Sequence, residues 1–386
     1  MPQLKWKNKG KQAVSYLTVN GRVEMHRSVY WNHIYKSVVP LDKVLGIDTN
    51  SHSRGVREIC CRESVNNAFI KASDNIKRLA QITVSHESVR KIVEKTGAKV
   101  SALQHKVALE PEFVVENCIE QTLITGTDGV MVPLVTEKQK RNRRKKEAKK
   151  RKEQNRKSYA KACRPRKGSD GDYKEFKIAC FYSKDKEQQY VMGTGGNHEV
   201  IGRVLRKIAF NLGIDRARLS YSVSDGAVWI DNNYRVYLPM LEHRLLDCHH
   251  FKEHLVELSQ SLFGIENPDA LEWKDMMYKT ALENGSMVLL HKLKDYTDQI
   301  KTDEQQKAYD GFYKYISKRI DMTDYPLFLA KGMDIGSGPT ESFCKSLTAR
   351  LKGSGMRWDR DNAQAIMSLA ALYASNQWKQ YWDIAA

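Results

Sequence analysis

The chain has 386 residues, of which 41% are apolar, and its formal net charge is +18. This composition supports packed cores in two or three domains and excludes an intrinsically disordered chain. The seven cysteines include no Cys-x-x-Cys pair, which argues against a zinc ribbon and against a disulfide framework. Because the sequence contains no apolar run of about 18 residues and no apolar leader, we expect a soluble, cytoplasmic protein without a membrane span.

The first element in chain order is a β-hairpin. Residues 12–31 form two β-type segments around Asn20-Gly21, the dipeptide favoured in tight type I′ turns. We therefore expect a small β region over residues 1–48.

Residues 49–105 form a helical region. Between residues 65 and 97 apolar residues recur at helical spacing in two blocks, with Ser85 suited to cap the second helix and Gly97 suited to end it. Two short helices joined by a polar turn predict a helix-turn-helix that binds DNA, although a plain helical hairpin fits the pattern equally well. The second helix would direct four polar side chains outward: His86, Ser88, Arg90 and Lys91.

A strand is predicted over residues 121–135. Asp128 shares the phase of Ile124, Val130 and Val132, which places a carboxylate among residues that face a core. The alternative is that Asp128-Gly129 forms an ordinary turn, because both residue types favour turns.

Most of the net charge lies in the basic segment, residues 138–167, where 17 Lys and Arg face two Glu, a balance of +15. We expect such a block to repel itself unless a polyanion such as DNA relieves the repulsion. The alternative is a flexible, solubilising linker. The nearly uninterrupted basic residues are Arg143, Arg144, Lys145, Lys146, Lys149, Lys150, Arg151 and Lys152.

A second carboxylate ends another predicted strand. A hairpin over residues 176–192 and a helix over 200–212 come first, joined by a glycine-rich turn at 193–198. In residues 218–229, Leu219, Tyr221 and Val223 then alternate with serines, which predicts one buried face, and Asp225 falls in the buried phase. Two inward carboxylates repel each other unless a metal lies between them, and Mg²⁺ prefers such oxygen ligands.

The order of elements predicts an α/β fold in which helices flank a mixed sheet, as in ribonuclease-H-like nuclease cores. Residues 236–263 read as a helical stretch. We assign residues 106–260, with the basic segment, to the first part of a catalytic domain with this fold. Residues 261–330 would be a helical insertion before a third acid, and residues 331–386 the helical C-terminal part of the domain.

The third acid opens a predicted helix. Pro339 suits its first turn, Gly353 suits its end, and residues 343, 347 and 351 form an apolar seam. Glu341 therefore lies in the first helical turn, where a carboxylate can also serve merely as a partner of the helix dipole.

Four motifs in order resemble those of bacterial insertion-sequence DDE transposases. They are Thr-Asp128-Gly-Val-Met-Val-Pro, Ser-Asp225-Gly-Ala-Val-Trp-Ile, Leu-Asp247-Cys-His-His250, and Gly-Pro-Thr-Glu341-Ser followed by Gly-Met-Arg-Trp358. The resemblance implies a ribonuclease-H-like fold in which Asp128, Asp225 and Glu341 bind two Mg²⁺ or Mn²⁺ ions. Asp247 and His250 match a supporting Asp-x-x-His element. Relatives often begin with paired cysteines, which residues 30–45 lack.

The resemblance implies an enzyme that cleaves DNA at insertion-sequence ends and joins the 3′ ends to target DNA. The expected partners are double-stranded DNA and further copies of the chain on that DNA, in the bacterial cytoplasm at the nucleoid. Lys345 either touches a phosphate or pairs with Glu341. Trp229 and Trp358 either stack on bases or pack in the core. Further phosphate contacts are expected from Arg350, Lys352 and Arg357. Two alternatives stay open: a DNA-binding regulator with an inactive nuclease-like domain, and a host nuclease of the same fold.

Overall fold

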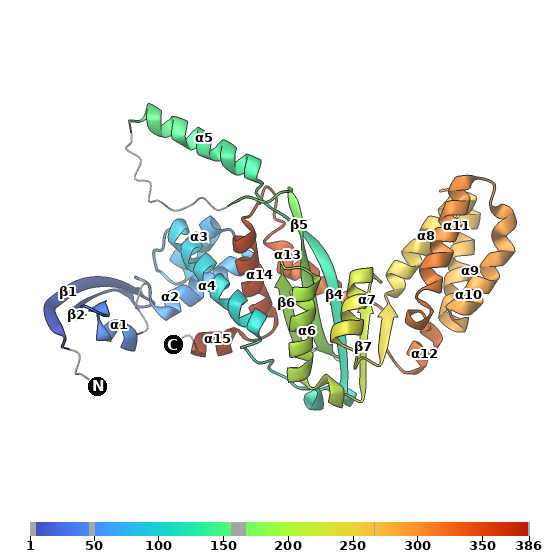
Figure 1. Cartoon of the computed structure of the whole chain (residues 1–386), viewed down its shortest axis with the longest axis horizontal. Coiled ribbons are helices and arrows are strands. Elements are labelled where there is room, and N and C mark those ends of the chain that lie inside the picture. Colours follow the sequence, from blue (N-terminus) through green and yellow to red (C-terminus); the bar gives the residue numbers. More distant parts are fainter. Residues whose placement is uncertain (1–4, 46–50, 156–166, 266, 385–386) are drawn as a thin grey trace. The chain divides into compact units, whose positions relative to one another are not determined.

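The computed structural model describes residues 5–45, 51–155, 167–265 and 267–384. The chain divides into two compact units. Unit 1 comprises residues 1–109, 131–174 and 346–386, and unit 2 comprises residues 110–130 and 175–345. Each unit is built from segments that are distant in the sequence (Figure 1).

Unit 1 begins with a β-hairpin of two twelve-residue strands, β1 (Lys7–Thr18) and β2 (Gly21–Asn32), followed by β3 (Lys36–Val38) and the short helix α1 (Pro40–Val44). The predicted hairpin is confirmed, but the type I′ turn is wrong. That turn needs positive φ at both central residues, whereas the loop residues Val19 and Asn20 do not have it and Gly21, paired with Thr18, has φ of 106°. The glycine therefore starts the second strand instead of completing the turn.

Three helices follow in unit 1: α2 (Arg54–Asn66), α3 (Phe69–Leu79) and α4 (His86–Lys106). Ser85 caps α4 as predicted, since its side chain accepts a hydrogen bond from the Ser88 amide. The expectation that Gly97 ends this helix is wrong, because α4 continues to Lys106. A Cβ at Gly97 would lie 2.4 Å from the Ala365 carbonyl oxygen of α14 (Arg360–Ala374), so this glycine allows two helices to pack closely. Unit 1 ends with α15 (Trp378–Ile384).

Part of the basic segment is helical. Helix α5 (Glu137–Glu153) begins with a capping box in which Thr136 and Gln139 bond each other's backbone, and none of its residues is buried. The self-repulsion expected of this segment does not prevent a helix over residues 137–153, because helical hydrogen bonds are local and the charged side chains point into water. Residues 156–166 lie outside the described part of the chain.

Unit 2 contains most of a five-stranded mixed sheet. Its strands are β4 (Thr122–Pro133), β5 (Tyr173–Ser183), β6 (Gln189–Thr194), β7 (Leu219–Ser224) and β8 (His243–Leu246), in the order β6-β5-β4-β7-β8. β5 and β6 are antiparallel, while β7 is parallel to both β4 and β8. Helices α6 (His198–Leu212) and α7 (Val228–Tyr237) flank this sheet (Figure 1). The predicted mixed sheet flanked by helices is confirmed, and so are the hairpin and the glycine-rich connection to α6.

Two predictions about this sheet need correction. β7 is buried on both faces, because Ser220, Ser222 and Ser224 are as inaccessible as the apolar residues between them. The strand lies between β4 and β8, and covered parallel strands need no exposed polar face. Residues 236–263 are not all helical: they contain β8 before α8 (Cys248–Phe263), and a strand of four residues is too short to show the alternation that would separate it from a helix.

The region predicted as a helical insertion is helical. It contains α9 (Pro268–Asn284), α10 (Ser286–Leu293), α11 (Asp303–Ser317) and α12 (Tyr325–Ala330), and α13 (Gly338–Ala349) follows. Short 3₁₀ helices lie at Val115–Asn117, Ile119–Gln121, Ile214–Arg216, Lys294–Gln299 and Ile320–Met322. Among the described residues, no helix is both long and apolar enough to cross a membrane.

Candidate active site

The strand register aligns three aspartates. The pairing of β4 with β7 runs from Thr122 opposite Leu219 to Thr125 opposite Ser222, and Asp128 and Asp225 each follow the last pair by three residues. The pairing of β7 with β8 ends with Ser224 opposite Leu246, and Asp225 and Asp247 are the residues that follow this last pair. Because parallel strands end on the same side of a sheet, segments far apart in the sequence bring three aspartates to one region of it.

Asp128 is half-buried on β4. Its Oδ1 accepts a hydrogen bond from the Gly129 amide at 2.5 Å, and its Oδ2 accepts one from the Cys344 thiol at 3.4 Å. Burial raises the pKa of Asp128 above its usual range, and the negative charge of Asp225 raises it further. The ionised carboxylate of Asp128 is therefore destabilised in this environment, and a bound cation would stabilise it.

Asp225 lies at the turn that follows β7. Its Oδ1 accepts a hydrogen bond from the Ala227 amide at 2.8 Å, and Gly226 has φ of 75°. The helical insertion holds this turn from outside, because the Tyr315 hydroxyl donates to the Asp225 carbonyl at 3.1 Å and the Arg319 guanidinium donates to the Gly226 carbonyl at 2.7 Å. The insertion thus fixes the direction of the second carboxylate.

The first turn of α13 packs directly on β4. A Cβ at Gly126 would lie 1.8 Å from the Thr340 Oγ1, so only glycine fits there. The Cys180 thiol lies 3.5 Å from both the Gly126 carbonyl and the Thr340 hydroxyl. Since Gly126 and Asp128 share one face of β4, this contact brings Glu341, the residue after Thr340, to the side of the sheet that carries Asp128.

The Glu341 carboxylate is bonded to neighbours on its own segment. Its Oε1 accepts a hydrogen bond from Ser337 at 3.4 Å, and its Oε2 lies 3.4 Å from the Lys345 ammonium. Of the two interpretations of Lys345, a phosphate contact or a pair with Glu341, the structure contains the pair. As arranged, the described residues include no group of three or more His, Cys, Asp or Glu that could hold a metal ion.

The buried Asp247 and the partly exposed His250 form an ion pair beside these acids. The His250 Nδ1 donates to the Asp247 Oδ2 at 2.7 Å, and the Ser337 amide donates to the Asp247 Oδ1 at 3.0 Å. This pairing with Asp247 raises the pKa of His250 to about 9. Burial acts to raise the pKa of Asp247, but the hydrogen bonds from His250 and Ser337 outweigh it, so that pKa lies below its usual value. Asp247 therefore ties β8, α8 and the approach to α13 together.

The residues predicted to bind DNA fall into different environments. All eight basic residues from Arg143 to Lys152 are exposed on α5, and Lys352 and Arg357 are exposed too. Arg90 pairs with Glu87 at 2.6 Å and with Glu94 at 2.8 Å, and Lys91 lies 3.6 Å from Glu87. The helix-turn-helix assignment stays a prediction.

Arg350 needs correction as a DNA contact. It is 7% exposed, its Nε donates to the Asn67 carbonyl at 2.8 Å, and burial lowers its pKa. Its guanidinium packs over Trp358, which is itself buried and donates from Nε1 to the Leu351 carbonyl at 3.1 Å. Both side chains therefore belong to the core. Trp229 is half-buried, with the Lys177 ammonium 4.9 Å from its ring centre.

Several residues that build the site were not singled out from the sequence. Cys344 follows Glu341 by three residues and so shares its helix face, a spacing that could have indicated it. Gly126, two residues before Asp128 on the same strand face, could have been recognised as a close-approach position. Tyr315 and Arg319 have no such signal, because they reach the Asp225 turn from a distant helical region.

The sheet and its row of aspartates define a mixed α/β protein whose arrangement is compatible with a ribonuclease-H-like fold. A family model described as Uncharacterised protein family (UPF0236) matches residues 2–381, so the chain belongs to that family. No curated protein matches the sequence. Among solved structures, the Drosophila P element transposase strand transfer complex resembles this chain with a TM-score of 0.41 and 10% identity, over 86% of this chain and 94% of that one. A similarity of that size does not identify a shared activity.

Proposed function

We propose that the chain is a DNA transposase that cleaves phosphodiester bonds at insertion-sequence ends and joins the released 3′ ends to target DNA. The observation that supports this most is that the acids of four sequence-distant motifs converge in unit 2. The charge of Asp225 acts on Asp128, Asp247 is bonded to the loop before α13, and α13 carries Glu341 and contacts Asp128.

The acidic residues suit divalent cations. Carboxylate oxygens are the ligands that Mg²⁺ and Mn²⁺ prefer, and the raised pKa of Asp128 marks a place where positive charge is favourable. We assign Asp128, Asp225 and Glu341 as the residues that would hold two such ions. The Glu341 side chain is 41% exposed and makes only long contacts with Ser337 and Lys345, so it can exchange them. Ions held there would stabilise the negative charge of the phosphate and of the leaving oxygen.

The reaction that we assign has two displacements at phosphorus. In the first, a water oxygen forms the new P–O bond while the bond to the 3′ oxygen breaks, which leaves a 3′-hydroxyl on the element end. In the second, that hydroxyl oxygen attacks a target phosphodiester and the target's own 3′ oxygen leaves. Asp247 and His250 position β8 and the loop before α13, and Lys345 is placed to meet a phosphate when Glu341 releases it.

DNA is the proposed partner of the exposed basic helix α5. Its lysines and arginines would contact phosphates without reading sequence, so binding should weaken as salt rises. Sequence recognition at the element ends would fall to the helices of residues 49–105. We also propose that several copies act together, because two element ends must be handled in one reaction.

The test is cleavage and joining of a labelled duplex that carries the element's own end, in Mg²⁺ or Mn²⁺. Asp128→Asn, Asp225→Asn and Glu341→Gln should each bind the duplex yet lose both activities by at least about 100-fold. Asp310→Asn, an exposed carboxylate of the insertion, is the matched control and should keep both.

Two results would contradict the proposal. Strong binding with no metal-dependent cleavage would favour a DNA-binding regulator. Cleavage without any joining would favour a nuclease of the same fold.

A further inference from the structure

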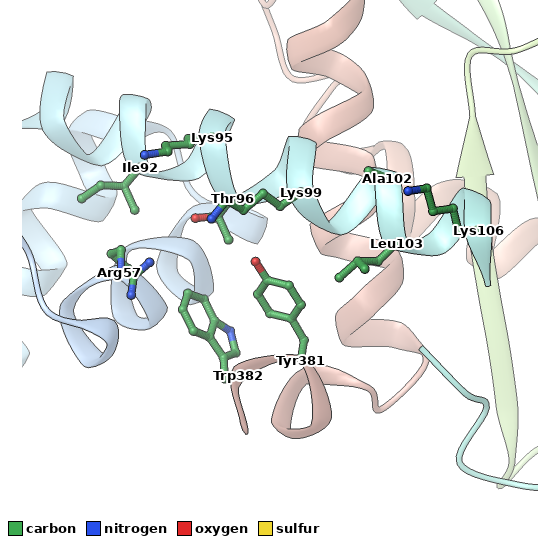
Figure 2. A pocket seen from close by; sticks show the side chains of 10 residues that line it. All are labelled: Arg57, Ile92, Lys95, Thr96, Lys99, Ala102, Leu103, Lys106, Tyr381 and Trp382. Carbon is green, nitrogen blue, oxygen red and sulfur yellow. The ribbon is translucent and has the colours of Figure 1, made fainter. Parts of the chain in front are cut away.

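Unit 1 contains a cavity of about 380 Å³ between α4, α2 and α15 (Figure 2). This volume is within the range of small-ligand sites, roughly 300–1,000 Å³. None of the acids proposed for phosphodiester cleavage lines the cavity. It is a separate site.

The cavity combines two kinds of lining. Tyr381 and Trp382 rise from α15 toward α4, and with the apolar side chains of α4 they form an aromatic and apolar wall (Figure 2). Four cationic side chains and no acidic one complete the lining: Arg57, Lys95, Lys99 and Lys106. At neutral pH the site therefore favours a ligand that carries both a flat apolar part and negative charge.

Two buried donors in the lining have no hydrogen-bond partner in the described part of the chain. Trp382 is 2% exposed and its indole Nε1 is unpaired, as is the Nε of Arg57. A buried donor without a partner costs free energy, which an acceptor group of a ligand would recover if either side chain turned its donor toward the cavity. Lysine stems can also simply cover an apolar surface. That arrangement would leave these two donors without a hydrogen-bond partner. Burial raises the pKa of Tyr381 to about 12, so its hydroxyl stays protonated and can donate as well.

We propose that this cavity binds a nucleotide, with the base against Tyr381 and Trp382 and the phosphate among the lysines of α4. Every base has a π face and polar edges, which suit an aromatic wall and the unpaired indole donor. Its phosphate supplies negative charge that is attracted to these cationic side chains. The nucleotide comes either from an unpaired DNA strand or from the free mononucleotide pool.

The test measures binding to the full chain with two probes: a fluorescent oligo(dT) strand, and deoxynucleoside 5′-monophosphates as competitors. Ala102 is exposed on α4 and lines the cavity, so Ala102→Trp should fill it without disturbing the core. We expect this variant to bind oligo(dT) at least about 5-fold more weakly, the loss of one base stack. Ala349→Trp, exposed at the end of α13 and outside the cavity lining, is the control and should bind normally.

The possible results distinguish a site for free nucleotides, a site for an unpaired strand and the absence of a nucleotide site. Competition by monophosphates in wild type but not in Ala102→Trp would support a site for free nucleotides. Weaker oligo(dT) binding without such competition would support a site for an unpaired strand. Equal binding by wild type, Ala102→Trp and Ala349→Trp with both probes would overturn the proposal, even if Lys99→Glu weakened binding, because charge alone would then explain it. No arm depends on strand cleavage, so this test is independent of the proposed transposase activity.

Discussion

Asp128 on β4 and Asp225, the residue that follows the neighbouring parallel strand β7, are close enough for their charges to interact. Their charges repel, and this repulsion adds to burial in raising the pKa of Asp128. The charge of His250 and the hydrogen bonds from Gly129 and Cys344 lower that pKa only in part, so it stays above its usual value, and a divalent cation would stabilise the two carboxylates.

Relief of this repulsion should stabilise the metal-free protein. In EDTA at pH 7, Asp128→Asn should raise the urea midpoint of unfolding above that of wild type, because the neutral amide removes a carboxylate that is ionised at a cost. Asp310→Asn, at an exposed position, should leave the free energy of unfolding unchanged within about 0.5 kcal/mol. A lower midpoint for Asp128→Asn would show that its carboxylate is stabilising as it stands.

The contact between Gly126 and Thr340 should control where α13 lies. A Cβ at Gly126 would fall 1.8 Å from the Thr340 hydroxyl oxygen, so Gly126→Ala should push α13 away, destabilise the protein by about 1–3 kcal/mol and impair cleavage. The matched control is Gly311→Ala in α11, where a Cβ meets nothing within 4 Å. This variant should gain roughly 0.5–1 kcal/mol from helix propensity. Equal effects of the two substitutions on unfolding would refute the packing argument.

The pair of Asp247 and His250 should make stability depend on pH. The pKa of His250 is about 9 in the folded protein against 6.5 ordinarily, so its stabilisation is complete below pH 6.5 and is lost as the pH rises through 9. The pKa of Asp247 is lowered, so its stabilisation is present above pH 3.8 and is lost in acid. Urea unfolding in EDTA should therefore show this pair's contribution falling between pH 6.5 and 9.

Asp247→Asn should flatten that slope and cost about 1.5–3 kcal/mol at pH 6, the usual contribution of a hydrogen bond to a charged group. His254→Gln is the control, because His254 pairs with the exposed Glu257 and should leave the slope intact. A slope that survives Asp247→Asn would mean that other groups titrate in this range.

The basic helix α5 should govern the salt dependence of DNA binding. Replacement of Lys145, Lys146, Lys149 and Lys150 by Ala removes four exposed charges and should lower the slope of log K against log salt by up to about 3.6, or 0.9 for each lost phosphate contact. A control with the same change of charge replaces four exposed lysines of the helical insertion: Lys301, Lys307, Lys314 and Lys318. Similar slopes for the two variants would exclude α5 as the contact surface.

Periodic patterns predicted the elements well where one physical rule dominates. Alternation and helical spacing located β4, β7, α6 and α13, and Ser85 was recognised as a cap because its role is local. β8 was missed since its four residues, His243–Leu246, are too few to show a period that separates a strand from a helix. Gly97 was taken as a helix end because the sequence does not show that Ala365 packs against it.

The acids of the site could be predicted individually, but their arrangement could not. A carboxylate in the buried phase of a strand is visible in the sequence, as at Asp128 and Asp225. The register that aligns them depends on long-range pairing, and the turn at Asp225 is fixed by Tyr315 and Arg319 from the helical insertion. Arg350 looked like a phosphate contact because a buried guanidinium and an exposed one have the same sequence signature.

The most direct test of the central claim is Mn²⁺ binding to the free protein, because it needs no knowledge of the element's DNA sequence. Titration followed by the paramagnetic resonance of free Mn²⁺ should show binding by wild type. Asp128→Asn and Asp225→Asn should each weaken that binding by at least about tenfold, a loss of roughly 1.4 kcal/mol, while Asp310→Asn binds as wild type does. Unchanged Mn²⁺ affinity in both substituted proteins would contradict the assignment of these two aspartates to one metal centre.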